Sequence, residues 1–198
     1  VIEADTRPLA TCFLDSNRLA ISRNEVLEIE ILDLETQNVV HRLPVEDEVT
    51  ALTWSPATQL LAAGTAVGGE IDLWKSSDQS FRSLMRLSGH RGRITRLYFA
   101  THGRVLASNS WDSTTRFWDA IGTRELMKVE AVAVANPGFG RDGRALAMSG
   151  PAQRYSIANV TYDGPLRNLP RSHPEGHEWA IRYHPTDDRL LAVATANG

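Results

Sequence analysis

Residues 88–119 read SGHRGRITRLYFATHGRVLASNSWDSTTRFWD, and this stretch decides the fold. Short runs rich in apolar, aromatic and β-branched residues, such as 105–108 and 115–118, alternate with Gly, Asn, Asp and Ser, which favour turns. Two aromatic residues of this stretch, Phe99 and Trp118, stand 19 residues apart. The stretch therefore predicts short β-strands joined by tight turns.

The same pattern recurs along the whole chain. An aromatic residue, a few small or polar residues, a turn and a strand rich in Leu, Val and Ala follow one another five times. The copies open at Phe13, Trp54, Phe99, Phe139 and Tyr183, which are 41, 45, 40 and 44 residues apart. A second anchor follows the first four after 19 or 20 residues, at Leu32, Trp74, Trp118 and, in degraded form, Ala158. Two anchors that keep one phase predict a structural repeat of 40–45 residues.

Strands are favoured over helices within each repeat. The pairs Asp142-Gly143 and Asp187-Asp188 stand where a tight hairpin should turn. No segment long enough for a helix shows a convincing 3.6-residue period, and the Gly, Pro and Asp turns exclude the paired amphipathic helices of helical repeats. We therefore predict an all-β fold.

The best copy runs from Ser88-Gly89-His90 to Phe117-Trp118-Asp119, and it resembles a WD40 repeat. The resemblance implies a β-propeller built from four-stranded sheets, or blades. We expect about four complete blades with partial blades at both ends, in one partial propeller domain spanning 1–198. The expected repeats are approximately 8–43, 48–87, 90–129, 131–169 and an incomplete 173–198.

In the third copy the resemblance implies a hydrogen-bonded tetrad formed by His90, Ser108, Asp112 and Trp118. A buried imidazole needs a partner on each nitrogen, and a buried indole N–H needs an acceptor. A catalytic His/Asp/Ser site is the competing interpretation, but blade geometry puts these groups inside the sheet, so we expect a structural role.

The other copies depart from this pattern. Residues 44–48 replace the Gly-His of the second copy, and Lys75 replaces the acidic residue after its tryptophan. Leu32 stands in the tryptophan position of the first copy. In the fifth copy both His173 and His177 are candidates for the Gly-His histidine, and spacing does not choose between them. We expect most blades to rest on apolar packing.

The repeat pattern is incomplete at both ends of the sequence. Residues 1–3 match the outer strand of a preceding blade, and the sequence stops after the second strand of the fifth copy. We expect the remaining blades to come from missing parts of the same, larger polypeptide.

The composition of the chain limits the classes of partner and the compartment that we expect for it. The net charge of −3 gives no drive toward nucleic acid or an anionic membrane, and no apolar run is long enough to span a bilayer. The single cysteine, Cys12, suits a reducing compartment, so we expect a cytoplasmic protein with this thiol buried as a small hydrophobe. We expect solvated faces for the basic stretch 82–96 and the acidic segment 46–48.

Two apparent ligand motifs are better explained by the repeat. Residues 138–143 match GxGxxG, but Ser149-Gly150-Pro151 would stop the helix that a dinucleotide fingerprint must open. His173, His177 and His184 suggest a metal site, yet Pro174 and Gly176 break the helix that such pairs favour. We expect neither cofactor nor metal.

The sharpest site hypothesis is an interaction face. Trp111 directly precedes the turn residue Asp112, and Arg91 and Arg93 lie on the adjoining loop of the same repeat. Trp179 should lie on the same face. Tryptophan flanked by arginine is typical of protein interfaces. The alternative is that Trp111 merely covers a neighbouring loop.

We therefore expect a non-catalytic scaffold, or a docking or sensor module, that binds a protein partner. The arginine-rich, lysine-poor repeats resemble those of bacterial WD40 proteins, which often belong to larger signalling polypeptides. The alternative is a ligand-binding or regulatory propeller fused to an enzyme such as a Ser/Thr protein kinase or a STAND NTPase. No P-loop, HRD or DFG motif occurs in this sequence.

Overall fold

A computed structural model describes residues 7–77 and 80–130, and then the backbone of 138–139, 145–150, 154–159, 167–169, 178–183 and 191–195. Side chains are described through Val129. Every regular element among these residues is a β-strand. No helix of the described part is long and apolar enough to cross a membrane.

The strands form antiparallel sheets in sequence order. The first sheet comprises β1 (Pro8–Phe13), β2 (Arg18–Arg23), β3 (Glu28–Asp33) and β4 (Asn38–Pro44). The second comprises β5 (Val49–Ser55), β6 (Leu60–Thr65), β7 (Ile71–Ser77) and β8 (Ser80–Leu87). The third comprises β9 (Ile94–Phe99), β10 (Val105–Ser110), β11 (Thr114–Asp119) and β12 (Arg124–Glu130).

The same order continues beyond the third sheet. The fourth sheet comprises β13 (Gly138–Phe139), β14 (Ala145–Gly150), β15 (Arg154–Asn159) and β16 (Arg167–Leu169), and β17 (Glu178–Tyr183) pairs with β18 (Leu191–Thr195). The predicted all-β architecture of four-stranded blades is confirmed. Residues 138–139 of the GxGxxG segment form β13, and the next described residues, from Ala145, form the strand β14 and not a helix.

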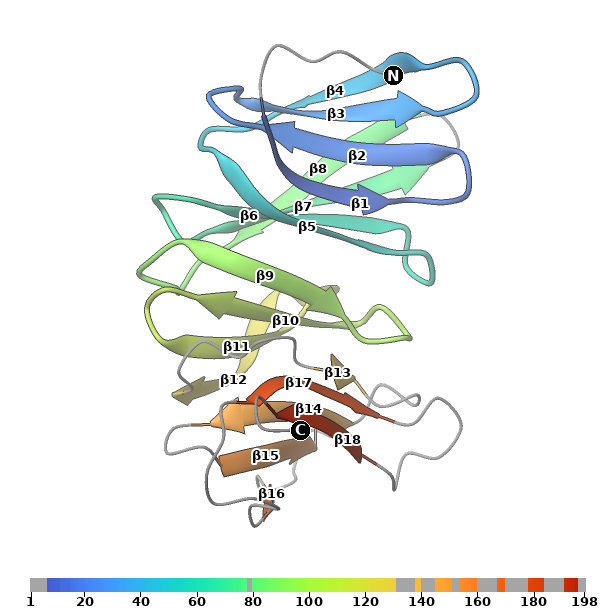
Figure 1. Ribbon diagram of the computed structural model, residues 1–198. Helices are drawn as coiled ribbons and strands as arrows, with labels where there is room; N and C mark the ends of the chain where they lie inside the picture. Colours follow the sequence, from blue (N-terminus) through green and yellow to red (C-terminus); the bar gives the residue numbers. More distant parts are fainter. Residues whose placement is uncertain are drawn as a thin grey trace.

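Neighbouring sheets stack face to face, and their innermost strands contact each other, β1 with β5 and β5 with β9 (Figure 1). Strand β6 shows why the middle strands are apolar on both faces. Leu60 and Ala62 pack toward the third sheet with Leu106 and Trp118, whereas Leu61 and Ala63 pack toward the first sheet with residues that include Ile29 and Ile31. Because successive side chains of a strand point to opposite faces, a strand between two sheets needs a continuous apolar run.

The repeat is visible in the strand register. The second anchor lies opposite a leucine of the preceding strand in each of four sheets, as Leu19–Leu32, Leu61–Trp74, Leu106–Trp118 and Leu146–Ala158. In the first three sheets the outermost strand also carries one extra residue beside this anchor, a β-bulge. Leu32 and the degraded anchor Ala158 therefore keep the place of the tryptophan although they lack its indole.

Strand order fixes which loops share a face. The β2–β3, β6–β7 and β10–β11 loops emerge together at the left edge of Figure 1, and we call this side the loop face. The β1–β2, β5–β6 and β9–β10 loops emerge on the opposite side.

Candidate interaction face

A network of four side chains supports the loop face in the third sheet. The His90 Nε2 atom lies 2.7 Å from Ser108 Oγ, and His90 Nδ1 lies 2.9 Å from Asp112 Oδ2. The Trp118 indole N–H donates to Ser108 Oγ across 2.8 Å. The structure thus brings together all four residues that the sequence assigned to the tetrad.

These contacts form one consistent chain of donors. Because the indole N–H can only donate, Ser108 Oγ accepts a hydrogen bond from Trp118. The Ser108 hydroxyl in turn donates its own hydrogen bond to His90 Nε2. His90 Nδ1–H then donates to the Asp112 carboxylate. Every polar side-chain atom in this row of hydrogen bonds has a partner when the imidazole is neutral with its proton on Nδ1.

The electrostatics agree with a neutral histidine and an ionised aspartate. Burial lowers the pKa of His90 below its ordinary value of 6.5, and this outweighs the opposing effect of Asp112. Partial burial would raise the pKa of Asp112, but hydrogen bonds from Thr114, the Arg91 backbone N–H and His90 hold it well below 3.8.

The network is a clamp and not a reaction centre. The His90 side chain is completely buried, and so is Ser108, so neither group can reach a substrate. Instead the Arg91 backbone N–H donates to Asp112 Oδ2 across 2.9 Å, and the Trp111 backbone N–H donates to the Arg93 carbonyl across 3.0 Å. The clamp therefore ties the β10–β11 loop to the loop that precedes β9.

Trp111 projects from this clamped pair of loops. It is 71% exposed, and the Arg93 guanidinium lies 5.4 Å from the centre of its ring. Arg91 is exposed on the same loop as Arg93. The structure thus brings together Trp111, Arg91 and Arg93. The side chain of the fourth candidate, Trp179 in β17, lies outside the described residues, as do His173, His177 and His184.

The structure adds two apolar residues that the sequence analysis missed. Leu27 in the β2–β3 loop is 54% exposed, and Val67 in the β6–β7 loop is 83% exposed. With Trp111 they give three consecutive sheets one exposed bulky apolar side chain each, at the corresponding loop. We call Leu27, Val67 and Trp111 the apolar row. A search of the whole segment between the second and third strands of each repeat, without residue-by-residue alignment, would have found it.

The acidic segment 46–48 differs from the expected solvated loop. The Asp47 carboxylate accepts the backbone N–H groups of Val67 and Gly68, and Glu48 accepts that of Glu25. These bonds lower the pKa of Asp47 even though its partial burial acts in the opposite direction. The segment that replaces Gly-His therefore holds the loops that carry Leu27 and Val67. Only Glu46 is strongly exposed, and it pairs with Arg86.

The basic stretch 82–96 is also not uniformly solvated. Arg86 pairs with Asp72, Glu46 and Glu70 at 2.7, 2.6 and 3.0 Å. Hydrogen bonds from the Arg86 guanidinium to Asp72 and Glu46 raise the pKa of Arg86. This arginine therefore belongs to an ion-pair cluster that ties β8 to β7 and to the 46–48 segment.

A known family model matches three of the four strands of the third sheet. The WD40 model, described as a WD domain or G-beta repeat, matches residues 81–119. The match begins in β8 and ends with the last residue of β11, so it includes the tetrad. The chain therefore contains a WD40 repeat. The family predicted from the repeat is thus confirmed.

Several curated proteins resemble this WD40 chain. A periodic tryptophan protein 2 homolog of Neurospora crassa is 43% identical over 63 residues, 32% of the chain and 7% of that protein. Periodic tryptophan protein 2 of Saccharomyces cerevisiae is 32% identical over 117 residues, 57% of the chain and 12% of that protein. WD repeat-containing protein 37 of Xenopus laevis is 26% identical over 174 residues, 85% of the chain and 34% of that protein.

The WD40 chain spans about a third or less of the length of these three relatives. All three come from eukaryotes. The comparisons therefore give no support to the bacterial origin that the arginine-rich composition suggested.

Proposed function

We propose that this WD40 chain is a non-catalytic scaffold whose protein partner docks on the loop face. The observation that carries the proposal is the apolar row, in which Leu27, Val67 and Trp111 are exposed at corresponding loops of three consecutive sheets. Scattered exposed apolar residues are ordinary, but bulky ones repeated along one face mark an interaction surface.

The rigidity of the loops supports the same proposal. Asp112 holds the loop of Trp111, Asp47 holds the loop of Val67, and Glu48 bonds the start of the loop that carries Leu27. A surface whose loops are already ordered loses less conformational entropy when it binds. Trp111 and Arg93 are also the residue types that most often dominate binding energy at interfaces.

A partner captured with the chain and then purified provides the test. Trp111→Ala should weaken its affinity by at least about tenfold, and Val67→Ser should weaken it less, because a central tryptophan carries more binding energy than an aliphatic neighbour. Phe13→Ala is the matched control, since Phe13 is a 65% exposed aromatic residue that ends β1 on the opposite side.

The affinities are measured by calorimetry, with thermal unfolding as the check on folding. Loss of binding in Phe13→Ala with full binding in Trp111→Ala would move the interface to the other side of the molecule.

A regulatory propeller within an enzyme-containing polypeptide, such as a kinase or a STAND NTPase, is the alternative proposal. It predicts that the full-length reading frame encodes a catalytic domain beside the repeats.

Location in a reducing compartment such as the cytoplasm is part of our proposal as well. It is supported by the single cysteine, because this sequence has no second cysteine to form a disulfide with it. Burial between the first two sheets also raises the pKa of Cys12 to about 12, so this thiol is unreactive.

A further inference from the structure

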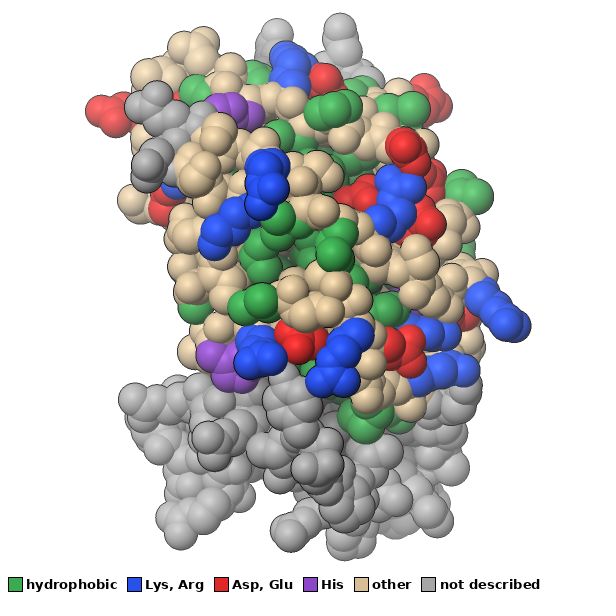
Figure 2. Space-filling view, turned by 180° about the vertical axis from the view of Figure 1, so that it is seen from behind, with side chains coloured by type: hydrophobic (Ala, Val, Ile, Leu, Met, Phe, Trp, Pro, Cys, Tyr) green, Lys and Arg blue, Asp and Glu red, His purple; other side chains and the backbone are tan. Residues whose placement is uncertain are grey.

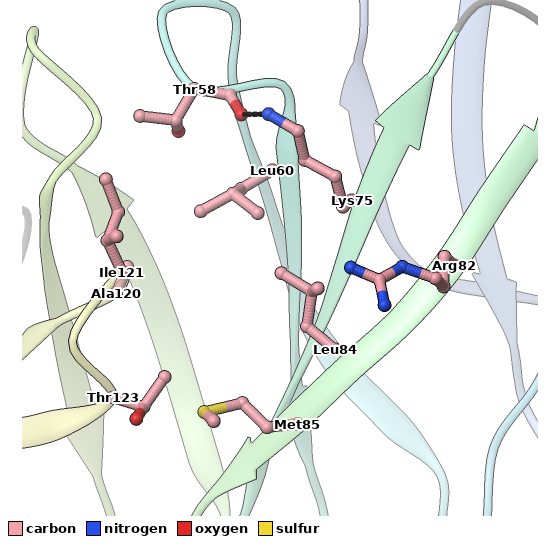
Figure 3. A pocket seen from close by; sticks show the side chains of 9 residues that line it. All are labelled: Thr58, Leu60, Lys75, Arg82, Leu84, Met85, Ala120, Ile121 and Thr123. Carbon is pink, nitrogen blue, oxygen red and sulfur yellow. Dashed lines mark hydrogen bonds between the residues drawn. The ribbon is translucent and has the colours of Figure 1, made fainter.

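A groove of about 450 Å³ lies between the second and third sheets, away from the loop face. The outermost strand β8 contributes Arg82, Leu84 and Met85, and the β11–β12 loop contributes Ile121 (Figure 3). The opposite view of the molecule shows a hollow lined by hydrophobic side chains with basic side chains at its edge (Figure 2). Its volume falls in the range of about 300–1,000 Å³ that is usual for ligand sites.

The apolar lining results from the β-bulge in β8. Met85 lies opposite Leu73 and Ser83 lies opposite Trp74, so Leu84 is the extra residue without a cross-strand partner. The bulge breaks the alternation of the strand, and the consecutive side chains of Leu84 and Met85 both reach the groove. Leu84, Met85 and Ile121 are 36, 39 and 61% exposed, which is costly unless something covers them.

Two cations stand side by side at the edge of the groove. Lys75 and Arg82 are direct cross-strand neighbours in β7 and β8, and like charges in such positions are destabilising. The Lys75 ammonium donates to the Thr58 carbonyl and so uses one of its three protons (Figure 3). Within residues 7–77 and 80–129, no ion pair joins Arg82 to a carboxylate. Asp78 and Gln79, between the two strands in sequence, lie outside the described residues.

This positive charge is a specific departure from the repeat. Asp33 and Asp119 occupy the place of Lys75 in the first and third sheets, where their carboxylates accept backbone N–H groups of the following turn. Four residues after Arg82 on the same strand, Arg86 is neutralised by three carboxylates. The groove alone combines a lysine in the aspartate position with an arginine that has no acidic partner among the described residues.

We propose that this groove binds a short acidic and apolar segment of a partner protein. A carboxylate of the segment lies between Lys75 and Arg82, and an adjacent bulky apolar side chain fills the space beside Leu84, Met85 and Ile121. This site is separate from docking on the loop face. It adds a second, charge-selective surface to the scaffold.

Selection of random heptapeptides displayed on phage against the 198-residue chain tests the proposal. We expect enriched peptides that place Asp or Glu next to Leu, Ile, Phe or Met. A fluorescein-labelled copy of the most enriched peptide then measures affinity by fluorescence anisotropy. Arg82→Glu and Leu84→Ser should each weaken the affinity for the peptide at least about tenfold. The first change places a negative charge beside the carboxylate of the peptide, and the second removes an apolar contact.

Matched variants serve as controls. Arg96→Glu makes the same charge change at an exposed residue of β9, and Val40→Ser changes the extra residue of the corresponding bulge in β4. Both should stay within about twofold of the unchanged chain, as should Trp111→Ala, because none of them touches the groove. The groove variants therefore test peptide binding in the groove, and Trp111→Ala tests docking on the loop face, so failure of one proposal is distinguished from failure of the other. Thermal unfolding confirms that each variant is folded.

The proposal is overturned if no peptide is enriched, if the enriched peptides are basic, or if either groove variant binds normally. Analytical ultracentrifugation tests whether a second copy of the chain occupies the groove instead. A dimer of the chain that Leu84→Ser dissociates would overturn the proposal in favour of a second copy.

Discussion

Trp74 and Trp118 occupy the same place in consecutive sheets, each opposite a leucine of the preceding strand and beside a β-bulge. Both rings are buried, and each packs toward the preceding sheet. Their polar environments differ, because Ala63 occupies in β6 the place that Ser108 occupies in β10. The repeat therefore keeps the position of the ring while the hydrogen bond to serine belongs to the third sheet.

Replacing each tryptophan by phenylalanine separates packing from hydrogen bonding. Both changes leave a similar cavity, but only Trp118→Phe removes the donor to Ser108 Oγ. We expect Trp118→Phe to lower the free energy of unfolding by about 1 kcal/mol more than Trp74→Phe does. Urea denaturation followed by far-ultraviolet circular dichroism measures the difference. Equal losses would mean that the indole hydrogen bond adds nothing to stability.

Removing the hydroxyl at the centre of the tetrad should cost more. Ser108→Ala leaves both the Trp118 N–H and His90 Nε2 without a partner in a buried site. We expect a loss of about 2–6 kcal/mol, since two buried groups become unsatisfied and each costs about 1–3 kcal/mol. Ser83→Ala is the control, because Ser83 is exposed on β8. If the two variants unfold at the same urea concentration, the tetrad does not stabilise the sheet.

The sequence predicted those features that depend on local spacing. The anchors follow from positions within one repeat, whereas the four-stranded order and the meeting of His90 with Asp112 were implied by the resemblance of that repeat to WD40. Trp111 was found because it is the neighbour of a predicted turn residue.

Features that depend on contacts between repeats were missed. Val67 lies in a loop of five residues, 66–70, whereas the corresponding loop of the third sheet has three, 111–113, so alignment on the strands does not superimpose them. The hydrogen bonds from the Val67 N–H to Asp47 and from Arg86 to Glu46 join residues 20 and 40 positions apart. No local periodicity encodes such pairs, and the groove beside Lys75 needs side chains from two sheets.

The tetrad should make stability depend on pH. Since burial lowers the pKa of folded His90 below 6.5, the unfolded chain binds this proton first as the pH falls. The free energy of unfolding therefore decreases below about pH 6.5, by at most about 1.4 kcal/mol per pH unit for one proton. The lowered pKa of Asp112 adds a second loss below pH 3.8, where the unfolded carboxyl takes up its proton before the folded one does.

His90→Gln tests the assignment of the first loss. It should reduce the slope of stability against pH between pH 7 and 5 relative to the unchanged chain. Urea midpoints at half-unit pH steps give the slopes of the variant and of the unchanged chain. An unchanged slope in His90→Gln would assign the acid sensitivity to other groups.

The contact between the second and third sheets depends on the absence of a side chain at Gly64. A Cβ atom added there would lie 2.3 Å from Ile94 Cγ2 and 2.6 Å from Ile94 Cβ, closer than any real contact. Ile94 is completely buried at the start of β9, so it cannot turn away, and one sheet must shift. We expect Gly64→Ala to destabilise the chain by about 1–3 kcal/mol, the usual cost of overpacking.

Gly68→Ala is the matched control for this prediction. The nearest atoms to its added Cβ belong to the flexible Glu70 side chain, at 3.3 Å and beyond, and residue 68 is exposed in the β6–β7 loop. We expect a change within about 0.5 kcal/mol, as for other surface positions. Thermal and urea unfolding of the two variants give the comparison. If Gly64→Ala unfolds together with Gly68→Ala, the two sheets can separate without cost, and the close stacking at Ile94 does not hold the blades in register.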